Sequence, residues 1–254
     1  MILVLTIERQ DLILSLLKEQ EVVKVKDICD LTNASESTVR RDLTELEKRQ
    51  YIKRVHGGAS LIKQKRDEPT FVEKTTRNYH EKEAISEQAV SHIEAGDSIF
   101  LDAGSTTLAL IPFLAQKSVV VVTNGIPHVP LLIEHNIETY VIAGKAKQGT
   151  AALTGTKAVE SVREYRFDKC FLGINGVHLE QGLTTPDPEE ASVKRAALEQ
   201  AQATYVLADS SKFGEVSFAN VASLAQVNLV TTNHVSEEQQ TALRKQTNLE
   251  VVSL

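Results

Sequence analysis

Residues 37–59 decide the N-terminal fold, and they read Ser37-Thr-Val-Arg-Arg-Asp-Leu-Thr-Glu-Leu-Glu-Lys-Arg-Gln-Tyr-Ile-Lys-Arg-Val-His-Gly-Gly-Ala59. Val39, Leu43 and Leu46 recur at i, i+4 and i+7, which is the spacing of a helix with one buried stripe. From residue 51 onward, apolar and basic residues alternate up to a Gly-Gly pair that permits a tight or left-handed turn. The stretch therefore predicts an amphipathic helix followed by a basic β-hairpin.

Two more helices are expected before this stretch. Residues 8–20 carry leucine and isoleucine at helical spacing, and residues 25–32 contribute Ile28 and Leu31, with residues 33–35 as the turn that follows. Three helices and a hairpin can enclose one small core in about sixty residues. This is the layout of a winged helix-turn-helix domain that binds DNA, which we place at residues 1–60.

The charge distribution supports a DNA-binding end. Residues 40–66 contain nine Lys/Arg and three Asp/Glu, whereas residues 67–254 contain 15 Lys/Arg and 24 Asp/Glu. The whole-chain charge of −6 therefore conceals a basic region that could neutralise phosphates and an acidic remainder. Without this asymmetry, the basic residues of the hairpin would be read as an ordinary solvated strand face.

The first turns of a recognition helix usually contact base edges and phosphates, and arginine can hold either guanine or phosphate with two hydrogen bonds. The hairpin, as the wing, would add contacts beside the helix. The candidate DNA-binding residues are Ser35, Ser37, Thr38, Arg40, Arg41, Lys53, Arg54, His56, Gly57 and Gly58.

Residues 8–59 resemble the N-terminal domain of the DeoR family of bacterial transcriptional repressors. Three pieces carry the resemblance: Ser-Thr-Val-Arg-Arg-Asp-Leu at 37–43, Leu-Glu at 46–47, and Arg-Val-His-Gly-Gly-Ala at 54–59. Gln50 departs from the family, which usually has glycine there, so we expect a local difference in the turn before the wing.

The rest of the chain is long enough for one further domain, since 254 residues with 42% apolar and 24% charged residues exceed a small DNA-binding domain. Residues 61–73 are polar and contain a proline, so we interpret them as a linker; a helix is expected over residues 74–93, within a second domain at 74–254. With two cysteines, Cys29 and Cys170, we expect neither a disulfide framework nor a zinc site. With no signal peptide and no membrane-spanning run, we expect a cytoplasmic protein without a membrane partner.

The second domain alternates short β-rich runs with helical stretches. The runs are residues 98–101, 119–123, 139–142, 169–174, 205–208 and 228–231. Such alternation predicts a three-layer α/β domain with a mainly parallel sheet. Ligands of open α/β sheets bind beyond the carboxyl ends of the strands, where this chain carries small and polar residues.

Two of these strand ends permit more than one interpretation. Residues 102–107 could offer backbone N–H groups and hydroxyls to a phosphate, or Ser105 and Thr106 could merely cap a helix. At residues 187–190, Asp187 fits a helix cap with Glu190 reaching back to it. Glu190 and Lys194 then lie one turn apart, as a surface ion pair or with Lys194 in a pocket.

This half resembles the DeoR sensor domain, which is similar in fold to ribose-5-phosphate isomerase. The resemblance implies a phosphorylated sugar as effector and no cofactor. The effector contacts that it implies are Asp102, Gly104, Ser105, Thr106, Thr107, Thr123, Asn124, Lys145, Asn175, Gly176, Glu190, Lys194, Asp209 and Lys212.

Within the family, residues 32–38, 165–171 and 182–188 are most similar to fructose-operon repressors of low-GC Gram-positive bacteria. That similarity implies fructose 1-phosphate as the inducer, while a lactose phosphotransferase system repressor that responds to tagatose 6-phosphate is the nearest alternative. We expect a homo-oligomer, a dimer or a tetramer, that binds double-stranded operator DNA and is released from it by the phosphosugar.

Two other classes of function remain open. A sugar-phosphate isomerase or deaminase could use Asp102, Glu190 or Asp209 as a general base beside Lys194 or Lys212. An enzyme, however, needs no DNA-binding domain, and His128, His178 and His234 are scattered, as loop or surface histidines would be. A DNA-associated structural protein without a ligand is the third class. We expect a regulator that is not an enzyme.

Overall fold

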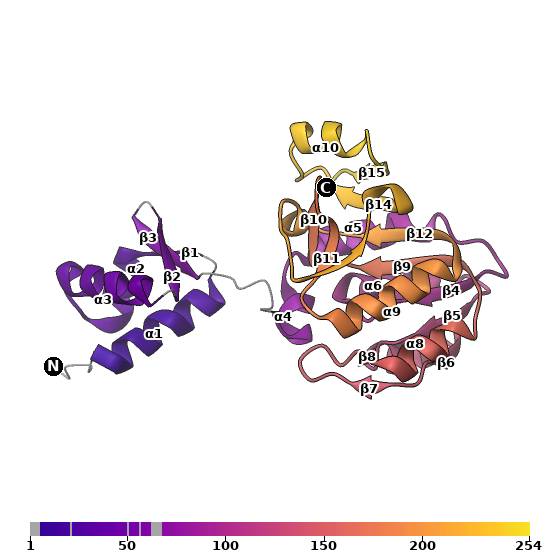
Figure 1. Cartoon of the computed structure of the whole chain (residues 1–254), viewed down its shortest axis with the longest axis horizontal. Helices are drawn as coiled ribbons and strands as arrows, with labels where there is room; N and C mark the ends of the chain where they lie inside the picture. The colour runs from indigo at the N-terminus through magenta and orange to yellow at the C-terminus, as the bar shows by residue number, and fades with distance from the viewer. Residues whose placement is uncertain (1–5, 21, 50, 56, 62–67) are drawn as a thin grey trace. The chain divides into compact units, whose positions relative to one another are not determined.

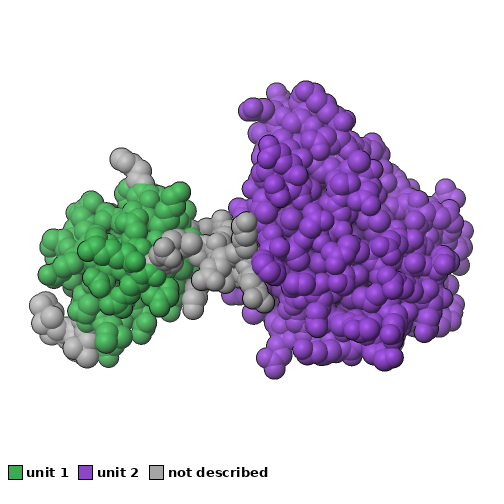
Figure 2. Space-filling view, viewed as in Figure 1, with its two compact units in different colours: residues 1–64 green, residues 65–254 purple. Residues whose placement is uncertain are grey.

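The computed structural model describes residues 6–20, 22–49, 51–55, 57–61 and 68–254. The chain divides into two compact units, residues 1–64 and 65–254 (Figure 2). Among the described residues, no helix is long and apolar enough to cross a membrane.

The first unit contains the three predicted helices and the predicted hairpin, which confirms the winged helix-turn-helix fold (Figure 1). Its helices are α1 (Thr6–Glu19), α2 (Val25–Thr32) and α3 (Glu36–Lys48), and its hairpin consists of β2 (Ile52–Val55) and β3 (Gly58–Leu61). A short strand that the sequence pattern does not reveal, β1 (Val22–Lys24), pairs antiparallel with β3. The sheet order is β1-β3-β2, so the hairpin is anchored to the start of α2.

The core of this unit forms where the apolar stripes of the helices meet. Val39, Leu43 and Leu46 of α3 are buried against Ile13 of α1 and Ile28 of α2. The spacing that predicted α3 therefore also identified its packing face.

The structure explains why both positions at the turn of the hairpin are glycine. Gly57 has φ +76°, a left-handed conformation that favours glycine, and a Cβ on Gly58 would overlap the carbonyl oxygen of Val23 in β1. The Gly-Gly pair therefore makes the turn and admits the third strand.

The second unit is built on one seven-stranded parallel sheet with the order β15-β14-β12-β9-β4-β5-β6. The strands are β4 (Ser98–Leu101), β5 (Val120–Thr123), β6 (Glu138–Val141), β9 (Phe167–Gly173), β12 (Ala201–Leu207), β14 (Asn228–Thr232) and β15 (Asn248–Val252). All six strands predicted from the alternating pattern are present. The edge strand β15 was not predicted, because Asn248 and Glu250 interrupt its apolar run.

Two apolar clusters cover the faces of this sheet and make three layers, as predicted. Neighbouring residues of one strand point to opposite faces, so Phe100 belongs to one cluster and Ile99 to the other. The first cluster includes residues of α8 (Thr156–Arg163), α9 (Pro188–Glu199) and α10 (Glu237–Leu243). The second includes residues of α5 (Tyr79–Val90), α6 (Ser105–Leu110), η1 (Ile111–Leu114) and α7 (His128–Glu134).

Smaller elements complete the unit (Figure 1). An antiparallel sheet contains β10 (Gly176–His178), β11 (Gly182–Thr185) and β13 (Ala219–Ala222), and β7 (Lys145–Ala146) pairs with β8 (Leu153–Thr154). The 3-10 turns η2 (Ser210–Lys212) and η3 (Leu224–Gln226) lie in the C-terminal third.

The helix predicted over residues 74–93 is wrong in its extent, because the structure has two helices there. α4 (Phe71–Thr76) begins inside the stretch that we interpreted as linker, and α5 follows it. Asn78 lies between them with φ 51°, and Arg77 is extended, so no continuous helix can pass. Glycine and asparagine tolerate a left-handed backbone best. The asparagine at this position is therefore a sign of a helix break that the spacing of apolar residues does not reveal.

The strand order reverses between β4 and β9. From β4 the chain proceeds to β5 and β6 on one side, whereas β9 leads to β12, β14 and β15 on the other. Loops that leave the carboxyl ends of β4 and β9 therefore diverge, and in open α/β sheets this reversal point is where ligands bind.

Candidate functional site

The start of α3 presents hydroxyl groups on an exposed surface. Ser35 is the N-cap, and its Oγ accepts a hydrogen bond from the backbone N–H of Thr38 at 3.3 Å. The same oxygen lies 3.0 Å from Oγ of Ser37 and 2.9 Å from Oγ1 of Thr38. Ser35 therefore fixes where the helix begins, while Ser37 is exposed beside it.

The two arginines of α3 differ in their surroundings. Arg40 forms an i,i+4 ion pair with Glu36, with hydrogen bonds of 2.9 and 2.5 Å to Oε1 of the carboxylate. Arg41 is exposed and makes no ion pair or hydrogen bond with any residue that the structure describes. All donors of Arg41 are therefore available to a nucleic acid.

Contacts on the other end of α3 attach the wing to the helix. The backbone N–H of Arg54 donates to Oε1 of Glu47 at 2.9 Å, and its guanidinium donates to Oγ1 of Thr44 at 3.2 Å. Lys53 is exposed on β2. His56 and Gln50 lie outside the described residues.

On the face opposite to the arginines, α3 is tied to α1 by a buried ion pair. Nε of Arg9 lies 2.5 Å and its Nη2 3.2 Å from the carboxylate oxygens of Asp42. The pair fixes the rotation of α3, so its polar face points away from the core.

In the second unit, Asp102 and Lys194 meet at the point where the strand order reverses. Asp102 follows β4, and its Oδ2 accepts hydrogen bonds from the backbone N–H of Gly173 at 3.0 Å and from Nζ of Lys194. Lys194, on α9, also donates to the carbonyl oxygen of Gly173 at 3.0 Å. The exposed fractions of the two side chains are 3% and 7%. Lys194 therefore lies inside the rim, and its ion pair is with Asp102 and not with Glu190.

His128 lies in the same polar centre, so the expectation of a loop or surface histidine was wrong. It is fully buried at the start of α7, with Nε2 3.2 Å from Oγ1 of Thr107. The Thr107 hydroxyl lies within donating distance of the carbonyl oxygens of Asp102 (2.5 Å) and Gly104 (2.8 Å). Because its single proton serves a carbonyl, we assign the proton of the imidazole to Nε2.

Nδ1 of His128 then has no partner among the described residues. Burial lowers the pKa of His128 to about 4, although the charge of Asp102 acts in the opposite direction. The signal that could have located this histidine is Gly125, three residues earlier, where a Cβ would overlap the imidazole ring. His128 is therefore neutral at physiological pH.

The other loop residues at this rim mainly hold the strand ends together. Thr123 donates to the carbonyl oxygen of Leu101 at 2.7 Å and accepts from the N–H of Gly125 at 3.0 Å. Oδ1 of Asn124 accepts from the N–H of Ala103 at 2.8 Å. Thr106 is nearly buried, whereas Ser105 is only partly covered at the first position of α6.

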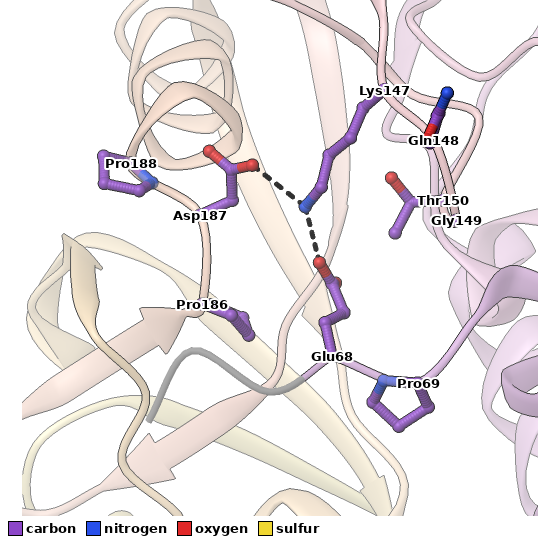
Figure 3. A pocket seen from close by; sticks show the side chains of 9 residues that line it. All are labelled: Glu68, Pro69, Lys147, Gln148, Gly149, Thr150, Pro186, Asp187 and Pro188. Carbon is purple, nitrogen blue, oxygen red and sulfur yellow. Dashed lines mark hydrogen bonds and ion pairs between the residues drawn. The ribbon is translucent and has the colours of Figure 1, made fainter. Parts of the chain in front are cut away.

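A charged cluster lies beside the N-terminus of α9, next to a cavity of about 270 Å³ (Figure 3). Nζ of Lys147 is 2.6 Å from Oε2 of Glu68, 3.0 Å from Oδ2 of Asp187 and 3.1 Å from Oε1 of Glu190. Burial alone would lower the pKa of Lys147, but its hydrogen bonds to Glu68 and Asp187 and the charge of Glu190 outweigh burial and raise it. Lys147 is therefore a permanent cation that three carboxylates share.

Asp187 caps α9 as expected, because its Oδ1 accepts from the N–H of Glu189 at 2.7 Å. Glu190 does not reach back to the cap residue. Its Oε1 instead accepts from Oγ1 of Thr150 at 2.8 Å, on the opposite wall of the cavity.

The sequence pointed to Lys145, whereas the structure places Lys147 at this cavity. Lys145 is exposed on β7, and its carbonyl oxygen accepts a hydrogen bond from Thr154. Glu68 was also missed, since no motif links it to residue 147, 79 positions later. Only the tertiary fold brings these two side chains together.

The remaining predicted residues follow the carboxyl ends of β9 and β12. Asp209 accepts from Nδ2 of Asn78 at 2.7 Å and caps η2, with Nζ of Lys212 3.7 Å away. Asn175 accepts from Thr185 at 2.9 Å, and its Nδ2 lies 3.5 Å from Oε1 of Glu68. Gly176 leaves no room for a Cβ, which would overlap the carbonyl oxygen of Glu215. Among the described residues, no group of His, Cys, Asp and Glu could hold a metal ion.

A winged helix-turn-helix unit joined to a parallel-sheet α/β unit with a polar rim defines the class of DNA-binding transcriptional regulators with a sensor domain. Two family models match the chain: the DeoR-like helix-turn-helix domain over residues 9–65 and the DeoR C-terminal sensor domain over residues 77–234. The chain belongs to the DeoR family.

Relatives of known sequence agree with this assignment. The chain is 49% identical over 230 residues to an uncharacterized HTH-type transcriptional regulator FruR of Bacillus subtilis, covering 90% of this chain and 92% of that protein. It is 35% identical over 234 residues to a lactose phosphotransferase system repressor of Staphylococcus epidermidis, covering 89% and 92%. The HTH-type transcriptional regulator GlpR of Haloferax volcanii is 34% identical, covering 89% of each chain.

Solved structures match the chain only weakly. A ribose 5-phosphate isomerase A of Methanocaldococcus jannaschii matches with a TM-score of 0.41 and 20% identity, covering 54% of this chain and 55% of that one. A likeness of this size is too distant to carry a function.

Proposed function

We propose that the chain represses a sugar-uptake or catabolism operon, that it binds operator DNA through α3 and the wing, and that a phosphorylated sugar releases it. The observation that carries the DNA-binding part is the exposed start of α3, with Arg41 unpaired among the described residues and Arg40 beside it. A recognition helix uses this end to meet base edges and phosphates. The basic charge of residues 40–66 supports the same face.

The effector site of the proposal is the polar rim at the reversal of strand order. This rim offers charged and hydrogen-bonding groups to a polar ligand. They come from the pair of Lys194 and Asp102, from Asn175, and from the cavity bordered by Lys147. Cations suit a phosphate, and carboxylates and amides suit sugar hydroxyls. The sequence resemblance to fructose-operon repressors makes fructose 1-phosphate our first candidate and tagatose 6-phosphate the second. The relatives named FruR and lactose phosphotransferase system repressor are consistent with a regulator of sugar use.

The carboxylates that an isomerase would need as a general base are all engaged. Asp102 accepts from Lys194, Glu190 from Thr150, and Asp209 from Asn78. Burial alone would raise the pKa of Asp209, but the charge of Lys212 and the hydrogen bonds from Ser211 and Asn78 lower it. A lowered pKa makes a weaker base. This favours a sensor that is not an enzyme.

Operator binding by the full chain tests the proposal. A labelled duplex from the DNA upstream of its own gene is titrated with protein, alone and with fructose 1-phosphate, fructose 6-phosphate or tagatose 6-phosphate. We expect release by one of the three, and an isomerisation assay with the same sugars should show no turnover. Operator affinity that ignores all three sugars would contradict the effector part of the proposal.

The proposal includes a homo-oligomer, a dimer or a tetramer, since paired half-sites on DNA require more than one recognition helix. Sedimentation of the free protein and of the protein on its duplex measures the number of chains. A single chain on the duplex would contradict this part.

A further inference from the structure

The carboxylate of Glu68 lies between two lysines, as a bound anion would. Its Oε1 is 2.6 Å from Nζ of Lys74 and its Oε2 is 2.6 Å from Nζ of Lys147, while Nδ2 of Asn175 lies 3.5 Å from Oε1. Only 10% of the Glu68 side chain is exposed. Burial alone would raise the pKa of Glu68, but the charge of Lys74 and the hydrogen bond from Lys147 lower it. Glu68 is therefore a carboxylate at neutral pH.

Polar contacts hold the segment that carries Glu68. No residue of α4 is fully buried, and the N–H of Phe71 donates to the carbonyl oxygen of Gly149 at 2.8 Å. At the other end of α4, Lys82 donates to the carbonyl oxygens of Lys74 and Arg77. An anion in solution can compete for the two lysines without disrupting an apolar core, while Lys82 keeps α4 on α5.

The other two acceptors of Lys147 are less free to leave. Asp187 is the cap of α9 and Glu190 belongs to its first turn, so the backbone of a helix holds both carboxylates in place. Glu68 instead lies outside any helix, three residues before α4 and near the N-terminal boundary of the second unit. Glu68, Lys147 and Asp187 all line the same cavity (Figure 3). Of the three carboxylates on Lys147, Glu68 is the exchangeable one.

We propose that Glu68 is an intramolecular ligand of an anion site formed by Lys74, Lys147 and Asn175, and that the phosphate group of the effector occupies this site by displacing it. The inference rests on the proposed function for the identity of the anion. A phosphate has more acceptor oxygens than a carboxylate and carries more charge, so it can satisfy both lysines and Asn175. Displacement removes the two lysine contacts of Glu68 near the N-terminal boundary of the second unit, and we expect the loss of these contacts to couple effector binding to operator affinity.

Calorimetric titration of the full chain with inorganic phosphate at fixed ionic strength tests the displacement. Glu68→Gln keeps the size of the side chain and removes its charge. The carboxylate then no longer competes with phosphate for charge-assisted hydrogen bonds to the lysines, so we expect the Kd for phosphate to fall about tenfold or more. Glu189→Gln is the matched control, because Glu189 lies on the first turn of α9 and accepts a hydrogen bond from Thr154, not from Lys147, so the variant removes a nearby charge without removing the displaced group. We expect it to change the Kd less than threefold.

Lys74→Met in the Glu68→Gln background should abolish phosphate binding. We replace Lys74 and not Lys147, because Lys147 then keeps its partners on α9 and the test does not depend on whether Lys147→Met folds. An unchanged Kd in Glu68→Gln would overturn the proposal. Equal gains in Glu68→Gln and Glu189→Gln would also overturn it, since charge removal alone would then explain them. Absence of phosphate binding in both the wild type and Glu68→Gln would exclude the anion site.

The same variants with fructose 1-phosphate, and with fructose as the neutral control, separate this inference from the proposed function. Tighter phosphate binding by Glu68→Gln with operator affinity that ignores every sugar phosphate leaves the anion site standing and overturns the effector function. Release of the operator by a sugar phosphate, with unchanged phosphate binding in Glu68→Gln, leaves the repressor standing and overturns the displacement.

Discussion

At the scale of single residues, two neighbouring arginines of α3 differ in whether they have an ion-pair partner. Arg41 is unpaired among the described residues, so Arg41→Ala should weaken operator binding by about 1 to 3 kcal/mol if the side chain reads a base. Arg40 must first give up Glu36, so its loss should cost less. Fluorescence anisotropy with the operator duplex at several salt concentrations measures both changes.

Arg49→Ala is the control for that measurement. Arg49 ends the same helix and pairs with Glu45 at 3.1 Å, away from the first turns. Its removal should leave operator affinity nearly unchanged. Equal losses in Arg41→Ala and Arg49→Ala would show that only net charge matters and would contradict the docking by the start of α3.

His128 makes the stability of the second unit depend on pH. Its folded pKa of about 4 lies below the ordinary value of 6.5, so between these values the unfolded chain takes up a proton that the folded chain does not. Its contribution is therefore fully favourable above about pH 6.5 and falls as pH drops toward 4, by about 3 kcal/mol in total. Urea unfolding at pH 4.5, 5.5 and 6.5 measures the slope.

His128→Gln isolates this effect, because all carboxylates titrate alike in both proteins. The difference in unfolding free energy between wild type and variant should shrink or change sign as pH falls, since glutamine does not titrate. Parallel pH profiles would show that His128 is protonated in the folded protein or is not buried.

At the scale of elements, Lys194 joins α9 to the ends of β4 and β9. Lys194→Met leaves the buried carboxylate of Asp102 without its cation, and we expect a loss of about 3 to 5 kcal/mol in unfolding free energy. Adding Asp102→Asn should recover part of that loss, because the uncompensated charge disappears. Arg195→Met, on the exposed side of the same helix, serves as the control. Full stability of Lys194→Met would mean that the pair is not structural.

Sequence patterns predicted elements well where one residue type decides the local structure. Val39, Leu43 and Leu46 located both α3 and its buried face, and the β-rich runs located six parallel strands. The prediction of one helix over residues 74–93 failed at Asn78, because a left-handed residue breaks the helix while the spacing of the apolar residues stays helical. β1 is three residues long, too short to show a period.

The candidate site was harder to predict, since its residues are related only by the fold. Asp102 and Lys194 were each candidates, but the ion pair between them spans 92 residues, and the sequence suggested Glu190 as the partner of Lys194 instead. Glu68 and Lys147 had no motif, and His128 was hidden because its only sequence signal is the glycine that makes room for it. The ends of the predicted strands indicate which residues lie at the rim, whereas the pairing of side chains across the rim depends on tertiary packing.

At the scale of the whole molecule, each unit has a core of its own. The first is centred on α1, α2 and α3, and the second on the two faces of the parallel sheet. We therefore expect calorimetry of the full chain to show two unfolding transitions, with the larger enthalpy belonging to residues 65–254. A single cooperative transition would show that the two units are energetically coupled.

The two ligands of the proposed repressor should shift different transitions. A sugar phosphate at 100 times its Kd stabilises the unit that binds it by about 2.7 kcal/mol, which corresponds to about 5 to 10 °C in a domain of this size. Fructose 1-phosphate should therefore raise only the transition of the larger unit, and the operator duplex only that of the smaller one. When both are present, each should reduce the shift caused by the other, because coupling between two sites is reciprocal. Shifts that simply add would mean that both sites bind while no signal passes between them.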